Sequence, residues 1–124
     1  MVRIFLDTSI LSHKSLGELA NRLAEHVSNG DELFISVLRH FEIIWGYMTA
    51  NLAPSNYREF LEKLGVSVVA LLEEDAIFAA EKKPEKRKLV DALIAATVNR
   101  YDAFVWTKDR DFKHFLPKEK IRIL

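Results

Sequence analysis

The sequence predicts a single α/β domain over residues 1–124, a three-layer α/β/α sandwich with a central, mostly parallel sheet of about five strands. Three observations support this fold class. Five short apolar runs recur along the chain, and they are mostly continuous rather than alternating, which is typical of strands covered on both faces. The segments between them space their apolar residues with a helical period. A chain of 124 residues with 49% hydrophobic content also suits one domain.

The predicted strands are the short runs rich in β-branched, aromatic and aliphatic residues. In chain order they cover residues 2–6, 32–36, 66–72, 104–107 and 121–124. Because each run is separated from the next by at least one helical segment, parallel pairing with crossover helices is expected.

The first predicted helix carries apolar residues at steps of one and three. It follows Ser15, which stands at capping-box spacing from Glu18, and it ends near Gly30. Its apolar positions are Leu16, Leu19, Ala20, Leu23, Ala24 and Val27.

Four further helices are predicted from the same spacing. The second has the apolar stripe Phe41, Ile44, Trp45 and Met48. The third has Tyr57, Phe60, Leu61 and Leu64 between Pro54 and Gly65. The fourth runs from about Asp75 to the break at Pro84, and the fifth carries Leu89, Val90, Leu93, Ile94, Thr97 and Val98.

Composition limits the classes of function. The 18 basic and 18 acidic residues cancel, so any polyanion must be held by local patches or bound metal. The chain has no cysteine, which excludes disulfides and thiolate chemistry. Arg3 and Asp7 interrupt the opening apolar run, and no later stretch is long enough to cross a bilayer, so we expect a cytoplasmic protein without membrane contact.

The charge run EKKPEKRK, residues 81–88, surrounds the proline between the last two helices. A solvated turn is the favoured interpretation, because runs of charge are usually exposed. The alternative is a basic lip beside a phosphate-binding cleft.

Acidic residues follow two predicted strands. Asp7 ends the first strand, and Thr107, Asp109 and Asp111 end or follow the fourth. Ligands of open parallel sheets bind beyond the carboxyl ends of the strands, so these side chains are expected to face one crevice. Thr8 or Ser9 would then begin the next turn.

Two more acids lie inside predicted helices. Glu42 flanks the apolar stripe of the second helix, and Asp91 shares a face with Ile94 and Val98. A carboxylate beside an apolar face indicates a partner or a function, because an unpaired buried charge destabilises the fold by about 3–5 kcal/mol.

Each acid also has a purely structural explanation. Asp7 is a possible N-cap, and Asp109 and Asp111 are possible solvated turn residues. Glu42 and Asp91 have potential ion-pair partners in Arg39, Arg100 and Lys88. Their predicted convergence favours a functional site, because clustered carboxylates repel one another unless a cation lies among them. Mg²⁺ or Mn²⁺ is the natural partner of such oxygen ligands.

Four segments in order resemble the motifs of the PIN domain: FLDTSIL, SVLRHFEI, LVDALIAATV and VWTKDRDF. The compact chain is most similar to the VapC toxins of prokaryotic toxin–antitoxin pairs. The resemblance implies a metal-dependent endoribonuclease that hydrolyses RNA and leaves 5′-phosphate and 3′-hydroxyl ends.

The same resemblance implies the roles of individual residues. It makes Asp7, Glu42, Asp91 and Asp109 ligands of one or two Mg²⁺ or Mn²⁺ ions, with Thr107 as a polar neighbour. Because PIN domains vary at the last motif, either Asp109 or Asp111 is the main ligand there, and Asp109 is favoured as the nearer to the strand. An antitoxin protein and a homodimer are the partners that it implies.

Other interpretations remain open. The chain is alternatively a catalytically silent PIN-like module that binds RNA or protein, or an RNA-processing PIN nuclease without an antitoxin. Trp45, Tyr47 and Met48 are expected to pack in the core, with a partner-binding face as the alternative. The histidines lack the i, i+4 spacing of a helical zinc site; they are His13, His26, His40 and His114.

Overall fold

The computed structural model describes residues 1–12 and 14–124. The strands are β1 (Arg3–Leu6), β2 (Glu32–Ser36), β3 (Ser67–Val69), β4 (Phe104–Thr107) and β5 (Ile121–Ile123). The α-helices are α1 (Leu16–Ser28), α2 (Val37–Thr49), α3 (Ser55–Leu64), α4 (Glu73–Glu81) and α5 (Leu89–Arg100). Short 3-10 helices are η1 (Thr8–Ile10), η2 (Lys86–Lys88), η3 (Arg110–His114) and η4 (Lys118–Lys120).

The strands form one five-stranded sheet in the order β3-β2-β1-β4-β5. Every neighbouring pair is parallel, which confirms the predicted parallel sheet. β1 is central and pairs with β2 on one side and β4 on the other. The carboxyl ends of these strands therefore lie along one edge of the sheet.

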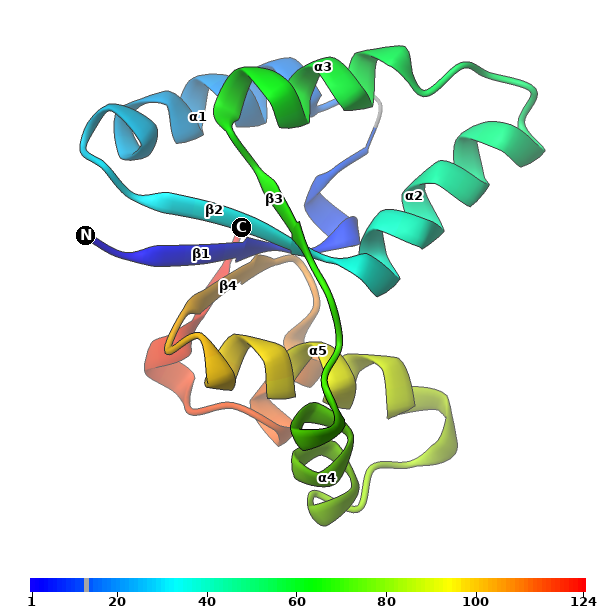
Figure 1. Ribbon diagram of the computed structural model, residues 1–124, viewed down its shortest axis with the longest axis vertical. Helices are drawn as coiled ribbons and strands as arrows, with labels where there is room; N and C mark the ends of the chain where they lie inside the picture. The colour runs from blue at the N-terminus through cyan, green and yellow to red at the C-terminus, as the bar shows by residue number, and fades with distance from the viewer. Residues whose placement is uncertain (13) are drawn as a thin grey trace.

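Helices cover both faces of the sheet, and Figure 1 shows α1 and α3 on the opposite side from α4 and α5. Side chains from α1, α2 and α3 pack into one core, while side chains from α4 and α5 pack into the other. Within β1, Ile4 and Leu6 enter the first core and Phe5 enters the second. Two-sided burial explains the continuous apolar runs and confirms the three-layer sandwich.

Some local boundaries differ from the prediction. β3 is shorter than residues 66–72, because this edge strand pairs only with β2 over Ser67–Val69. α4 begins at Glu73 rather than near Asp75, since the Asp75 carboxylate accepts a hydrogen bond from Leu72 N at 3.0 Å and so closes the first turn. Ser15 precedes α1 but makes no capping bond with its side chain, which instead contacts Ser12 and Ile10.

The predicted apolar stripe of α2 was largely wrong. Phe41, Trp45 and Met48 are 65%, 59% and 61% exposed. The helix packs on its other face, where Arg39, Ile43 and Tyr47 follow one another at steps of four and are buried. The core interpretation is therefore confirmed for Tyr47 and wrong for Trp45 and Met48.

Among the described residues, no helix is both long enough and apolar enough to cross a membrane. His13 lies outside the described residues. His40 hydrogen-bonds to Tyr57 at 2.8 Å.

Two truncations test the orientation of α2. Trp45→Ala should lower the free energy of unfolding by less than about 1 kcal/mol, because the side chain is already largely in water. Leu23→Ala, in the fully buried face of α1, should cost about 2–5 kcal/mol. Urea denaturation of both variants measures the difference, and equal losses would place Trp45 in the core.

Candidate active site

Asp7 and Thr107 meet at the carboxyl edge of the sheet. The register pairs Leu6 with Trp106, and Asp7 N donates to Trp106 O at 3.1 Å. Thr107 Oγ1 donates to Asp7 Oδ2 at 2.7 Å. Both residues are buried, at 3% and 0% exposure. Adjacent parallel strands thus bring together two residues that are 100 positions apart.

Ser9 joins the same hydrogen-bond network. Its hydroxyl donates to Asp7 Oδ2 at 2.9 Å and accepts from Lys108 N at 2.9 Å. It also lies 3.1 Å from Thr107 Oγ1. The sequence interpretation gave Ser9 no role beyond a turn, although a hydroxyl two residues after a strand-end acid was an available signal. Asp7 precedes η1, but its side chain makes no capping hydrogen bond, so the N-cap explanation is wrong.

The turn after β4 is held by Thr107 and Asp109. Asp109 N donates to Thr107 Oγ1 at 2.9 Å, and Asp111 N donates to Asp109 Oδ1 at 2.8 Å. Asp109 therefore caps η3, so a structural role for its Oδ1 is present in the turn. Its other carboxylate oxygen takes no part in that cap.

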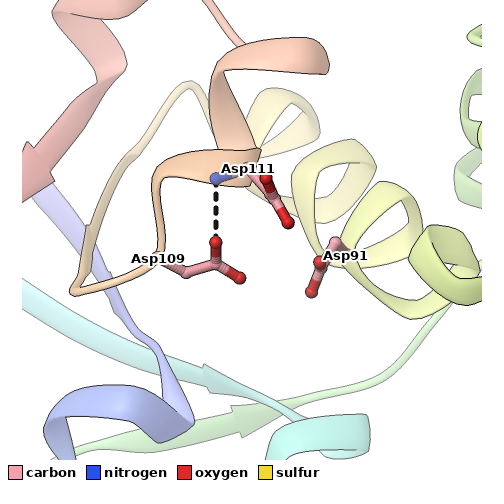
Figure 2. A group of neighbouring side chains, drawn as sticks. All are labelled: Asp91, Asp109 and Asp111. Carbon is pink, nitrogen blue, oxygen red and sulfur yellow. Dashed lines mark hydrogen bonds between the residues drawn. The ribbon is translucent and has the colours of Figure 1, made fainter.

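Asp91 lies in the first turn of α5 and adds its carboxylate to those of Asp109 and Asp111. One oxygen from each of Asp91, Asp109 and Asp111 lies within 4.8 Å of the other two. Figure 2 shows the three side chains projecting toward a shared space from α5 and from the turn that begins η3. Burial raises the pKa of Asp91, and the charges of Asp109 and Asp7 add to this effect while Arg39 opposes it.

Arg39, which the sequence analysis named only as a possible ion-pair partner, contacts three acids of the predicted site. Its Nε lies 2.7 Å from Asp7 Oδ1, its Nη1 lies 2.9 Å from Glu42 Oε1, and its Nη2 lies 2.6 Å from Asp91 Oδ1. The predicted alternative of ion pairs to Glu42 and Asp91 is thus confirmed for Arg39. Arg100 pairs with Asp75 instead.

The contact between Arg39 and Asp7 is close without being a hydrogen bond. Both Arg39 Nε and Asp7 Oδ1 are buried, and neither has a hydrogen-bond partner among the described residues. The 2.7 Å separation is therefore an electrostatic contact in which the N–H does not point at the oxygen. Asp7 Oδ1 therefore accepts no hydrogen bond within the described residues and is held by the charge of Arg39.

The residues fit a hard divalent ion. Asp91, Asp109 and Asp111 offer three carboxylate oxygens in one group, the donor type that Mg²⁺ and Mn²⁺ prefer, and the group contains no histidine. Asp7 and Glu42 lie beside this group, connected to Asp91 through Arg39.

The charge run of residues 81–88 is mostly exposed, in agreement with the favoured interpretation of a solvated turn. Among its charged residues, Lys88 is the exception. Its side chain is only 11% exposed, and its Nζ lies 3.7 Å from Asp111 Oδ1. One end of the run therefore places a cation beside the acidic group.

Solved structures share this fold at low sequence identity. VapBC2 from Rickettsia felis, bound to a DNA fragment from its promoter, has a TM-score of 0.72 at 16% identity over 98% of each chain. VapBC-1 from nontypeable Haemophilus influenzae has a TM-score of 0.68 at 20% identity, again over 98% of each chain. A toxin–antitoxin complex from Klebsiella pneumoniae has a TM-score of 0.63 at 20% identity, over 96% of this chain and 95% of that one.

A search among curated protein sequences finds no match. The sequence model of the PIN domain matches residues 4–115, a range that runs from β1 to the residue after η3 and contains every acid of the site. This protein therefore belongs to the PIN domain family.

Proposed function

We propose that the protein is a Mg²⁺- or Mn²⁺-dependent endoribonuclease and the toxin of a VapBC-type toxin–antitoxin pair. The observation that carries this proposal is the group of three carboxylates formed by Asp91, Asp109 and Asp111 at the carboxyl edge of a PIN-domain sheet. The similarity in fold to VapBC structures supports the toxin assignment.

In this proposal the acidic side chains hold the ion. Asp91, Asp109 and Asp111 each supply an oxygen, so the geometry supports both members of the last motif as ligands. Asp7 and Glu42, also predicted as ligands, border the group. These side chains would hold a divalent ion that, when bound, would supply a hydroxide-like nucleophile at neutral pH and offset the charge that develops on the phosphate.

Other groups of the chain support this chemistry. Thr107 and Ser9 hold the Asp7 carboxylate through Oδ2, while Asp7 Oδ1 lies against Arg39 Nε. Lys88 presents a positive charge at the edge of the acidic group, where it offsets repulsion between the carboxylates and an RNA phosphate. The group of Asp91, Asp109 and Asp111 contains no histidine, so the proposed chemistry assigns no general base to an imidazole.

Cleavage of RNA by the purified protein tests the proposal. Single-stranded and structured RNAs should be cut with Mg²⁺ or Mn²⁺ and stay intact with EDTA. Asp91→Asn removes one ligand charge with little change in shape, so the rate should fall at least about a hundredfold. Gel analysis of end-labelled RNA measures the rate and the ends of the products.

Asp102→Asn is the matched control. The Asp102 side chain is 88% exposed and pairs with Lys120. The residue precedes β4, at the amino ends of the strands and away from the acidic group, so the variant should cleave RNA at the wild-type rate. Cleavage that survives both EDTA and Asp91→Asn would exclude this site. RNA that is bound but never cut would instead identify a silent binding module.

We also propose that the protein forms a homodimer and binds an antitoxin. We assign the dimer interface to the exposed apolar face of α2, on which Phe41, Trp45 and Met48 lie together. The similar structures from Klebsiella pneumoniae and Haemophilus influenzae, described as a toxin–antitoxin complex and as VapBC-1, support an antitoxin. An RNA-processing nuclease without an antitoxin would lack such a partner.

Trp45→Glu should weaken self-association at least about tenfold, because it places a charge in the proposed dimer interface. Ile77→Glu makes the same change at a 55% exposed apolar residue of α4 and should leave the dimer intact. Sedimentation equilibrium measures both dissociation constants. A Trp45→Glu dimer as tight as the wild type would remove α2 from the interface.

A further inference from the structure

Arg39 is a buried cation at the centre of the site. Its side chain is 10% exposed and each of its three nitrogens faces a different carboxylate. These acids come from three places in the fold: Asp7 after β1, Glu42 from α2 itself, and Asp91 from α5. A guanidinium is planar and permanently charged, so it serves three acids at once where an ammonium would serve fewer.

The acids of the site form two sets. Asp7, Glu42 and Asp91 contact Arg39, and Asp91, Asp109 and Asp111 form the acidic group. Both oxygens of Asp7 are engaged by the chain, Oδ2 by Ser9 and Thr107 and Oδ1 by the close approach of Arg39. Glu42 Oε1 is likewise directed at Arg39. Asp91 belongs to both sets, because its Oδ1 binds Arg39 while the residue also contributes an oxygen to the group with Asp109 and Asp111.

We propose that Arg39 takes the place of a second metal ion, so that the site binds a single divalent cation through Asp91, Asp109 and Asp111. This inference rests on the metal site of the proposed function. The guanidinium compensates the charges of Asp7, Glu42 and Asp91, which would otherwise demand a further cation. Arg39 is thus a positioning residue that holds Asp91 in place for the ion on its other side.

A site with two ions would require Arg39 to leave. Its removal would uncover Asp7 Oδ1, which is buried and accepts no hydrogen bond within the described part of the chain. It would also leave Asp7, Glu42 and Asp91 without the permanent positive charge that a guanidinium supplies. Burial, permanent charge and three contacts favour a guanidinium that stays.

The number of bound ions tests this role directly. Isothermal titration with Mn²⁺, checked by counting free Mn²⁺ by electron paramagnetic resonance, should give one ion per wild-type chain. Arg39→Gln should melt at a lower temperature without metal, gain more stability from Mn²⁺ than the wild type, and bind a second ion. Arg39→Lys keeps one positive charge and should remain at one ion.

Arg100→Gln is the matched control, since Arg100 also pairs with a buried aspartate, Asp75, but away from the site. It should lose stability while the Mn²⁺ count and the Mn²⁺-induced shift in Tm stay as in the wild type. A count of two or of none in the wild type would overturn the proposal, as would an Arg39→Gln variant that binds one ion with an unchanged shift. If Arg39→Gln does not fold, the counts for the wild type and Arg39→Lys decide the question.

The ion count and the cleavage assay test the role of Arg39 and the nuclease assignment independently. RNA cleavage by a protein that holds two Mn²⁺ ions would overturn the role of Arg39 and leave the nuclease assignment standing. One bound Mn²⁺ without cleavage under any condition would leave the role of Arg39 standing and overturn the nuclease.

Discussion

The contact of one guanidinium with three carboxylates organises the carboxyl edge of this domain. Asp7 is almost fully buried, and a buried carboxylate without a cation is strongly destabilising. Arg39 supplies that cation from α2, on one face of the sheet, and reaches Asp91 of α5, on the other. The ion pairs therefore connect the two helical layers at the same edge where the acidic group lies.

A parallel sheet makes this arrangement possible. Because β1 and β4 are neighbours and run in the same direction, Asp7 and Thr107 arrive at one edge from distant parts of the sequence. Ser9 and Thr107 then hold one Asp7 oxygen, and the Thr107 hydroxyl also accepts from Asp109 N. The hydroxyls of Ser9 and Thr107 thus orient the Asp7 carboxylate, and the charges of Arg39 and Lys88 offset the repulsion among the acids.

The helix that supplies Arg39 has two different faces. Ile43 and Tyr47 continue the buried side of α2 into the core, and Arg39 stands at the end of that side next to the acids. Phe41, Trp45 and Met48 lie on the outer side, in water. A helix with apolar residues on both sides gives an ambiguous pattern, which is why the wrong stripe was assigned to the core from the sequence.

The apolar pattern of the chain was enough to predict the fold class, and the positions of the acids after strands and inside helices predicted that they would gather at one edge of the sheet. Continuous apolar runs between helical segments required a two-sided parallel sheet, and such a sheet brings the residues after β1 and β4 to one edge. The sequence offered Arg39, Arg100 and Lys88 as equal partners for Glu42 and Asp91. The choice among them depends on distances between elements that are remote along the chain, and these distances exist only in the folded domain. There Arg39 reaches Asp91 from α2, Arg100 pairs with Asp75, and Lys88 lies beside Asp111.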